Sequence, residues 1–154
     1  MSRPRDTQRR RVYNLDTRLE LLLERKGVQV RWPGDPAAHL TFCGILVQRL
    51  WEEQSERDEA GELLLPPPQV TDGGRHRNAS ATRSEVIRLP KGYRDPLTVV
   101  HEVAHCLIWQ RYRLAAAGHG RQYVALYCEL VHLYLGGTRV EIQECRLKAK
   151  VKAN

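Results

Sequence analysis

Apolar residues recur every three or four positions along much of the chain, a spacing that predicts amphipathic helices. The first such helix covers residues 7–26, and Gly27 ends it. Its apolar stripe consists of Val12, Leu15, Leu19, Leu22 and Leu23. A second helix is predicted at about residues 37–57. The residues expected to face inward from it are Leu40, Cys43, Leu46, Val47, Leu50 and Trp51.

Three further helices are predicted in the C-terminal half. One begins after Asp95, a good N-cap, with Pro96 in the first helical position, and runs to about residue 113. After a break at residues 115–118, another is expected at about residues 119–135, where a Gly-Gly pair stops it. Thr138 and Glu141 have the spacing of a capping box and predict a last helix.

Strand patterns are confined to two short regions. Residues 28–32 alternate between apolar and polar and predict a strand, and residues 70–89 are expected to form β-structure. Within the second region, residues 86–89 form a strand that Pro90 terminates. These elements predict an α+β fold in which several helices pack on a small β-sheet.

Size and charge place the chain among soluble globular proteins. It has 154 residues, 42% of them hydrophobic, which suits one domain over residues 1–154. The net charge is +7, and the basic ends at residues 1–10 and 147–154 are expected to be flexible tails. Such a basic surface could attract nucleic acid, although a solvated surface without a specific partner is the simpler interpretation. No apolar run suggests a membrane span or a secretory signal, so we expect a cytoplasmic protein.

The four cysteines lie far apart and include no Cys-x-x-Cys pair, which argues against a zinc ribbon. Three of them, Cys43, Cys106 and Cys128, fall in apolar stretches of predicted helices. We therefore expect buried free thiols rather than disulfides.

The stretch His101-Glu102-Val103-Ala104-His105 is the strongest chemical signal. On a helix, residues i and i+4 lie on the same face, so His101 and His105 present two imidazoles to one point, as a zinc ion needs. Glu102 lies about 100° around the helix, where it can take a proton from water beside the metal. This spacing predicts zinc-dependent hydrolysis.

A catalytic zinc needs a third protein ligand. His119, between two glycines at the start of the next predicted helix, is the first candidate, and a helix N-cap is its alternative role. Glu129, two turns further on, would be the third ligand if that ligand is a carboxylate. His132 points to the opposite side of the helix and is expected to be solvated or packed.

Two motifs in this part of the sequence resemble those of a known family. His101-Glu102-Val103-Ala104-His105 followed by His119-Gly120-Arg121-Gln122-Tyr123 is similar to the pattern of SprT-like zinc metallopeptidases. Residues 5–13 and 86–90 also resemble a small family of metallohydrolases from actinobacteria and their phages. The resemblance implies a zincin-like fold with the His-Glu-x-x-His motif on a central helix. It also implies His101, His105 and His119 as Zn²⁺ ligands and Glu102 as catalytic base.

A zincin-type peptidase commonly binds an extended peptide along an edge strand. The candidate for that strand consists of Val86, Ile87, Arg88 and Leu89. Tyr123 and Tyr127 could supply a hydroxyl that stabilises the oxyanion, although packing is the simpler explanation for each. A peptide or protein is the expected substrate. The alternatives are a zinc amidase that acts on a small molecule and a non-catalytic zinc-stabilised module that binds nucleic acid or protein.

Overall fold

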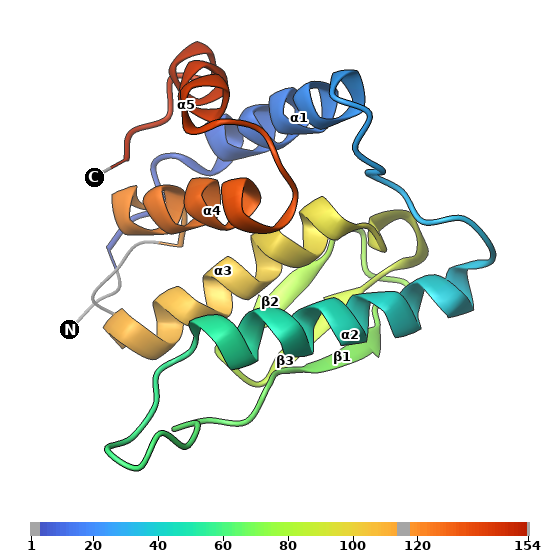
Figure 1. Cartoon of the computed structure of the whole chain (residues 1–154), viewed down its shortest axis with the longest axis vertical. Coiled ribbons are helices and arrows are strands. Elements are labelled where there is room, and N and C mark those ends of the chain that lie inside the picture. Colours follow the sequence, from blue (N-terminus) through green and yellow to red (C-terminus); the bar gives the residue numbers. More distant parts are fainter. Residues whose placement is uncertain (1–3, 114–117, 154) are drawn as a thin grey trace. The chain divides into compact units, whose positions relative to one another are not determined.

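The computed structural model describes residues 4–113 and 118–153. This part of the chain contains five α-helices and a three-stranded sheet, so the predicted α+β class is confirmed (Figure 1). The chain falls into two compact units, one made of Met1–Val30 with Leu114–Asn154 and the other of Arg31–Arg113. The prediction of one domain across the whole chain stays a prediction.

The first unit contains helices α1 (Arg9–Arg25), α4 (Arg121–Tyr134) and α5 (Arg139–Lys148). Helix α5 contacts both α1 and α4 (Figure 1). The predicted stripe of α1 is buried in full, and it consists of Val12, Leu15, Leu19, Leu22 and Leu23. Burial of this stripe stabilises the helix, because most helical stability in proteins comes from packing of an apolar face.

Local signals in the sequence set the ends of these helices. Gly27, just after α1, has a positive φ of 74°, a conformation that glycine adopts without strain. The predicted capping box of α5 is present, since Thr138 Oγ1 accepts a hydrogen bond from the Glu141 N–H and the Glu141 carboxylate accepts one from the Thr138 N–H. Helix α4 begins at Arg121, two residues later than predicted.

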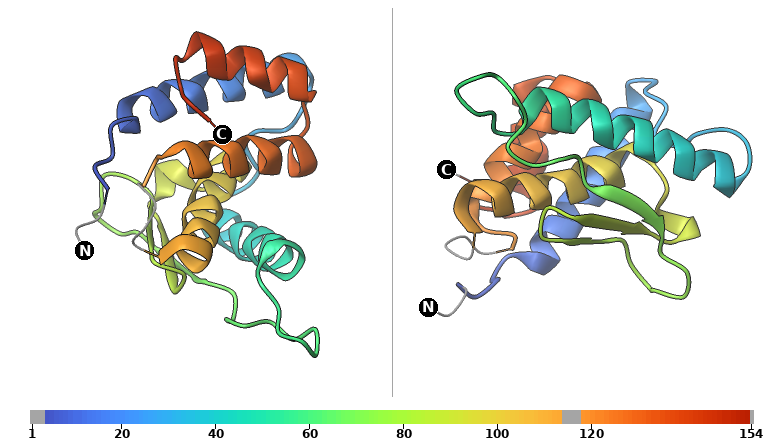
Figure 2. Two further views of the ribbon diagram at one scale, coloured as in Figure 1. Left: turned by 90° about the vertical axis from the view of Figure 1, so that its left-hand side faces the viewer. Right: turned by 90° about the horizontal axis from the view of Figure 1, so that it is seen from below.

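The second unit contains helices α2 (Pro36–Gln54) and α3 (Pro96–Tyr112) and strands β1 (Gln69–Asp72), β2 (Ser80–Thr82) and β3 (Val86–Leu89), with a short 3₁₀ turn at Lys91–Tyr93. Both helices lie on the same face of the sheet, where α2 contacts β1 and α3 contacts β2 (Figures 1 and 2). Buried apolar residues of α2, α3 and β3 form the core between these layers.

The order of the sheet corrects one prediction. Strand β3 is central, because it pairs with β1 in parallel and with β2 in antiparallel orientation. Val86, Ile87, Arg88 and Leu89 therefore cannot offer a free edge to a substrate, and the prediction of an edge strand there is wrong. The edges of this sheet belong to β1 and β2, and β2 is the edge strand that contacts α3.

A buried arginine fixes the corner from which α3 starts. Arg94 donates from Nε to the Leu89 carbonyl at 3.1 Å and from Nη1 to the Pro36 carbonyl at 2.7 Å. Its Nη2 lies 2.9 Å from Asp72 Oδ1, at the end of β1. One guanidinium thus joins the ends of two strands to the start of α2, immediately before α3 begins.

One predicted strand does not occur. Residues 28–32 form no strand, and the Val28 N–H instead bonds back to the Leu23 carbonyl at the end of α1. The flexibility of the basic ends stays a prediction, although parts of them make contacts in the structure. Gln8 is buried, α5 extends to Lys148, and the Lys152 N–H donates to Gln8 Oε1 at 2.6 Å. Within residues 4–113 and 118–153, no helix is long and apolar enough to cross a membrane.

Candidate metal centre

Helix α3 carries the histidine pair, and its start is set by the residues that the sequence marks. Asp95 Oδ1 accepts a hydrogen bond from the Thr98 N–H at 2.9 Å, and Thr98 Oγ1 donates to Asp95 Oδ2 at 2.7 Å. Pro96 lies in the first turn, where its missing N–H leaves no bond unmade. Most of the helix is buried, and side chains in its middle therefore lie within protein rather than in water.

His101 and His105 lie one turn apart on this helix. Their ring centroids are 5.1 Å apart, with 62° between the ring planes. His101 is only 6% exposed, and His105 is partly buried. Glu102 is also 6% exposed. A buried carboxylate is costly unless it is hydrogen-bonded or paired with a cation.

His119 precedes α4 and is held by contacts from α1 and from the segment before it. Its Nδ1 lies 2.6 Å from Asp6 Oδ2. The ring makes T-shaped contacts with Tyr13 and Tyr123, with centroid distances of 5.7 Å and 5.1 Å. The His119 carbonyl accepts a hydrogen bond from Gln8 Nε2 at 3.1 Å. Gly120, and not His119, is the N-cap of α4, so the alternative role of His119 as a cap is wrong.

The contact with Asp6 decides which nitrogen of His119 can bind a metal. An ionised carboxylate can only accept a hydrogen bond, so Nδ1 must carry the proton that it donates. The neutral ring then has its lone pair on Nε2, the form in which histidine binds a metal. Ligand histidines usually have such a carboxylate partner, which orients the ring and makes it more basic.

The structure brings the three predicted histidines together. His101, His105 and His119 each offer one ring nitrogen, and these atoms all lie within 4.8 Å of one another. Three imidazole nitrogens at this spacing could hold a metal ion, and this donor set suits zinc with one position left open. The residues present therefore fit the expected cofactor, and the identity of the metal belongs to the proposal below.

The competing third ligands have other partners. The Glu129 carboxylate forms two hydrogen bonds with Arg139, at 2.5 Å and 3.1 Å, and these bonds lower the pKa of Glu129. Glu129 is not part of the histidine group. His132 Nδ1 lies 2.8 Å from the Gly137 carbonyl, at the end of α4, which matches the packed role expected for it.

The two candidate tyrosines differ in what their contacts allow. Tyr127 is fully buried, and its hydroxyl donates to Asp16 Oδ1 at 2.6 Å. Burial, followed by the charge of Asp16, raises the pKa of Tyr127 well above its usual value. Tyr123 stacks on Tyr127 with centroids 5.6 Å apart and also faces His119. Tyr123 is as fully buried as Tyr127, but it is the one whose ring contacts one of the three histidines.

Sequence reasoning missed Asp6 and Gln8. Asp6 lies 113 residues from His119 along the chain, and Gln8 lies 111 residues from it. Periodicity and capping patterns report on neighbours within a few residues, so neither signal could connect these positions. The resemblance of residues 5–13 to a metallohydrolase family includes both positions but assigns neither of them a role.

Comparison with protein-family models, with curated proteins and with solved structures found no match for this chain. The resemblance to SprT-like metallopeptidases therefore stays a prediction, carried by residues 101–105 and 119–123.

Proposed function

We propose that this chain is a zinc-dependent hydrolase of the zincin type, and that it cleaves peptide bonds. The observation that carries the proposal is the group of three histidine nitrogens, with Glu102 adjacent to His101 in the sequence. Two histidines four residues apart with an intervening glutamate are the arrangement in which zinc-dependent hydrolases hold the ion and the base.

The protein groups have distinct roles in the proposed reaction. His101, His105 and His119 would hold the ion, which when bound supplies a Lewis acid and lowers the pKa of water. Glu102 would accept a proton from the attacking water and return it to the leaving amine. Its burial keeps competing water away from the carboxylate, which favours proton transfer at that position.

Strand β2 is the proposed place for the substrate backbone. It is an edge strand, and it contacts α3, the helix that carries Glu102. Ser84, two residues after β2, donates from its hydroxyl to the Cys106 carbonyl of α3 at 2.7 Å, which links the strand to the helix. An extended peptide could pair with β2 through main-chain hydrogen bonds. This favours a peptide over a small amide as substrate.

Elemental analysis of purified protein tests the metal centre. Wild type and Glu102→Gln should each contain close to one zinc per chain, whereas His119→Ala should lose most of it. His132→Ala is the matched control, because His132 is a histidine of α4 outside the group. Wild-type protein without metal after expression in zinc-supplemented medium would overturn the proposal, as would equal loss of zinc from His132→Ala and His119→Ala.

Hydrolysis of a quenched fluorescent peptide mixture tests the activity. Glu102→Gln should lower the rate by about 10²–10⁴-fold while zinc content stays unchanged, because general-base assistance has that magnitude. Unchanged hydrolysis in Glu102→Gln would refute the assigned base. A zinc-loaded wild type without any hydrolysis of peptides would refute the proposed substrate class.

A further inference from the structure

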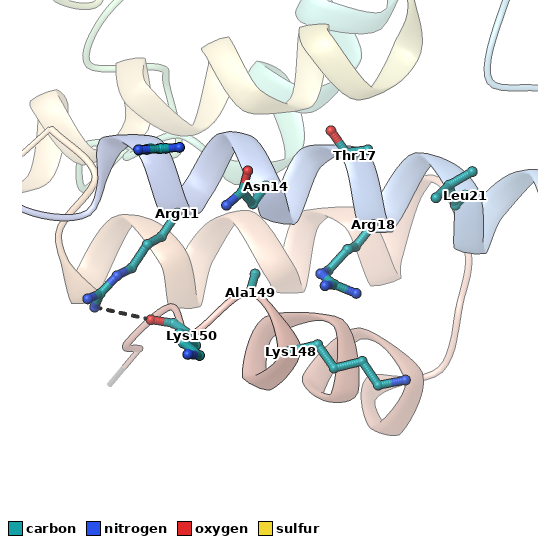
Figure 3. Close-up of a pocket in the computed structure, with 9 residues that line it drawn as sticks. Arg11, Asn14, Thr17, Arg18, Leu21, Lys148, Ala149 and Lys150 are labelled. Carbon is teal, nitrogen blue, oxygen red and sulfur yellow. Dashed lines mark hydrogen bonds between the residues drawn. The ribbon is translucent and has the colours of Figure 1, made fainter.

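A groove on the first unit gathers positive charge away from the histidines. Its volume is about 740 Å³, and it lies between α1 and the end of α5 with the segment that follows (Figure 3). Five of its nine lining residues are cationic and none is acidic. We call it the basic groove, and its cations are Arg10, Arg11, Arg18, Lys148 and Lys150.

The spacing of residues on α1 makes one wall continuous. Arg11, Asn14, Arg18 and Leu21 follow one another at intervals of three or four residues and therefore share a helix face. Arg11 and Arg18 are seven residues apart, which corresponds to about 10.5 Å along the axis. Two cations at this separation can contact different phosphates of the same strand.

The opposite wall comes from the last turn of α5 and the residues after it. Lys148 and Lys150 flank Ala149, which is buried and small (Figure 3). Arg11 Nη1 donates to the Lys150 carbonyl at 3.4 Å, a long bond that links the two walls. A small residue between two lysines leaves space for a ligand between the cations.

Two cations outside the groove, in the same unit, each have an acidic partner. Lys26 pairs with Glu141 at 3.1 Å, and Arg139 pairs with Glu129. Among the residues that the structure describes, none of the five groove cations forms an ion pair with a carboxylate, and all five are exposed. An anion bound in the groove would therefore offset the repulsion among these cations.

We propose that the basic groove binds the phosphate backbone of a nucleic acid without preference for sequence. Guanidinium and ammonium groups on two facing walls suit a chain of phosphates, to which arginine can donate two parallel hydrogen bonds. No aromatic residue lines the groove, so bases would not stack in it. A membrane surface fits less well, because Leu21 is the only large apolar side chain there and the cations line a concavity.

Fluorescence anisotropy with a labelled 20-nucleotide single strand, from about 50 to 300 mM salt, tests the proposal. Arg18→Ala combined with Lys148→Ala removes one cation from each wall. Arg75→Ala combined with Lys91→Ala is the matched control, because it removes the same two residue types from exposed positions of the other unit. Circular dichroism establishes that both double variants are folded.

Wild type and the control should bind equally. The groove variant should bind about tenfold more weakly at low salt, and its slope of log K against log[salt] should be shallower by about 1.4, since each lost phosphate contact on a single strand contributes about 0.7. Equal weakening in both double variants would overturn the proposal, because net charge alone would then explain binding. Stronger retention of the wild type on phosphatidylserine vesicles than on the oligonucleotide would also overturn it.

Discussion

The contact between Asp6 and His119 leads to a quantitative prediction for metal affinity. The two groups are 2.6 Å apart, and the carboxylate fixes the protonated nitrogen of a proposed ligand. Removal of such a carboxylate typically lowers metal affinity by about 10–100-fold, which corresponds to about 1.4–2.8 kcal/mol. We expect Asp6→Ala to lie in this range. Asp6→Asn should lie near its lower end, because an amide oxygen can still accept the hydrogen bond but carries no charge.

The assay is a competition titration of zinc against a chromophoric chelator at a fixed pH, with unfolding temperature measured in parallel. Asp16→Asn is the control. Asp16 accepts a hydrogen bond of the same length, 2.6 Å, from Tyr127, and its substitution changes the net charge by the same amount. It should leave zinc affinity within about twofold of wild type, because ligand orientation is unchanged. Wild-type zinc affinity in Asp6→Ala, beside clear loss in His119→Ala, would refute the positioning role.

Two further predictions concern packing and thiol chemistry. Gly73→Ala should lower the free energy of unfolding in urea by about 1–3 kcal/mol, because the new Cβ would lie 2.4 Å from Pro90 Cδ. Gly44 lies within α2 and has open space around it, so Gly44→Ala should raise the free energy of unfolding by about 0.5–1 kcal/mol. Equal stability of the two variants would contradict this reasoning. Native protein at pH 8 should react slowly with Ellman's reagent, and all four thiols should react only after unfolding. The reason is that burial raises the pKa of Cys43 and Cys128 to about 12 and also raises the pKa of Cys106 and Cys145. Rapid reaction of one full equivalent in the native state would contradict it.

Features that depend on neighbours a few residues apart were predictable from the sequence. The stripe of α1, the Asp95 cap of α3 and the capping box at Thr138 all occur as predicted. The prediction of free cysteines is also confirmed. Each of these features reflects helix periodicity, unpaired backbone groups at helix ends or the spacing of thiols.

Features that depend on distant pairing were not predictable. Residues 86–89 were correctly predicted as a strand, but only the pairing of β1 and β2 with it shows that this strand is central. The alternation at residues 28–32 resembled a strand, yet no neighbouring strand pairs with it in the described chain. The histidine pair of α3 was visible because its spacing is local, whereas the Asp6 contact joins residues 113 positions apart.

The side chain of Gln8 has a consequence for the order of events during synthesis. Its amide nitrogen donates to the carbonyls of His119 and Lys152, and its amide oxygen accepts from the Lys152 N–H. These bonds span up to 144 residues, and none can form before both of its partners have been translated. The bonds between Gln8 and Lys152 therefore form only after residue 152 has emerged from the ribosome. A nascent chain that already displays His101, His105 and His119 would still lack these two bonds, which hold the Gln8 amide beside the His119 carbonyl.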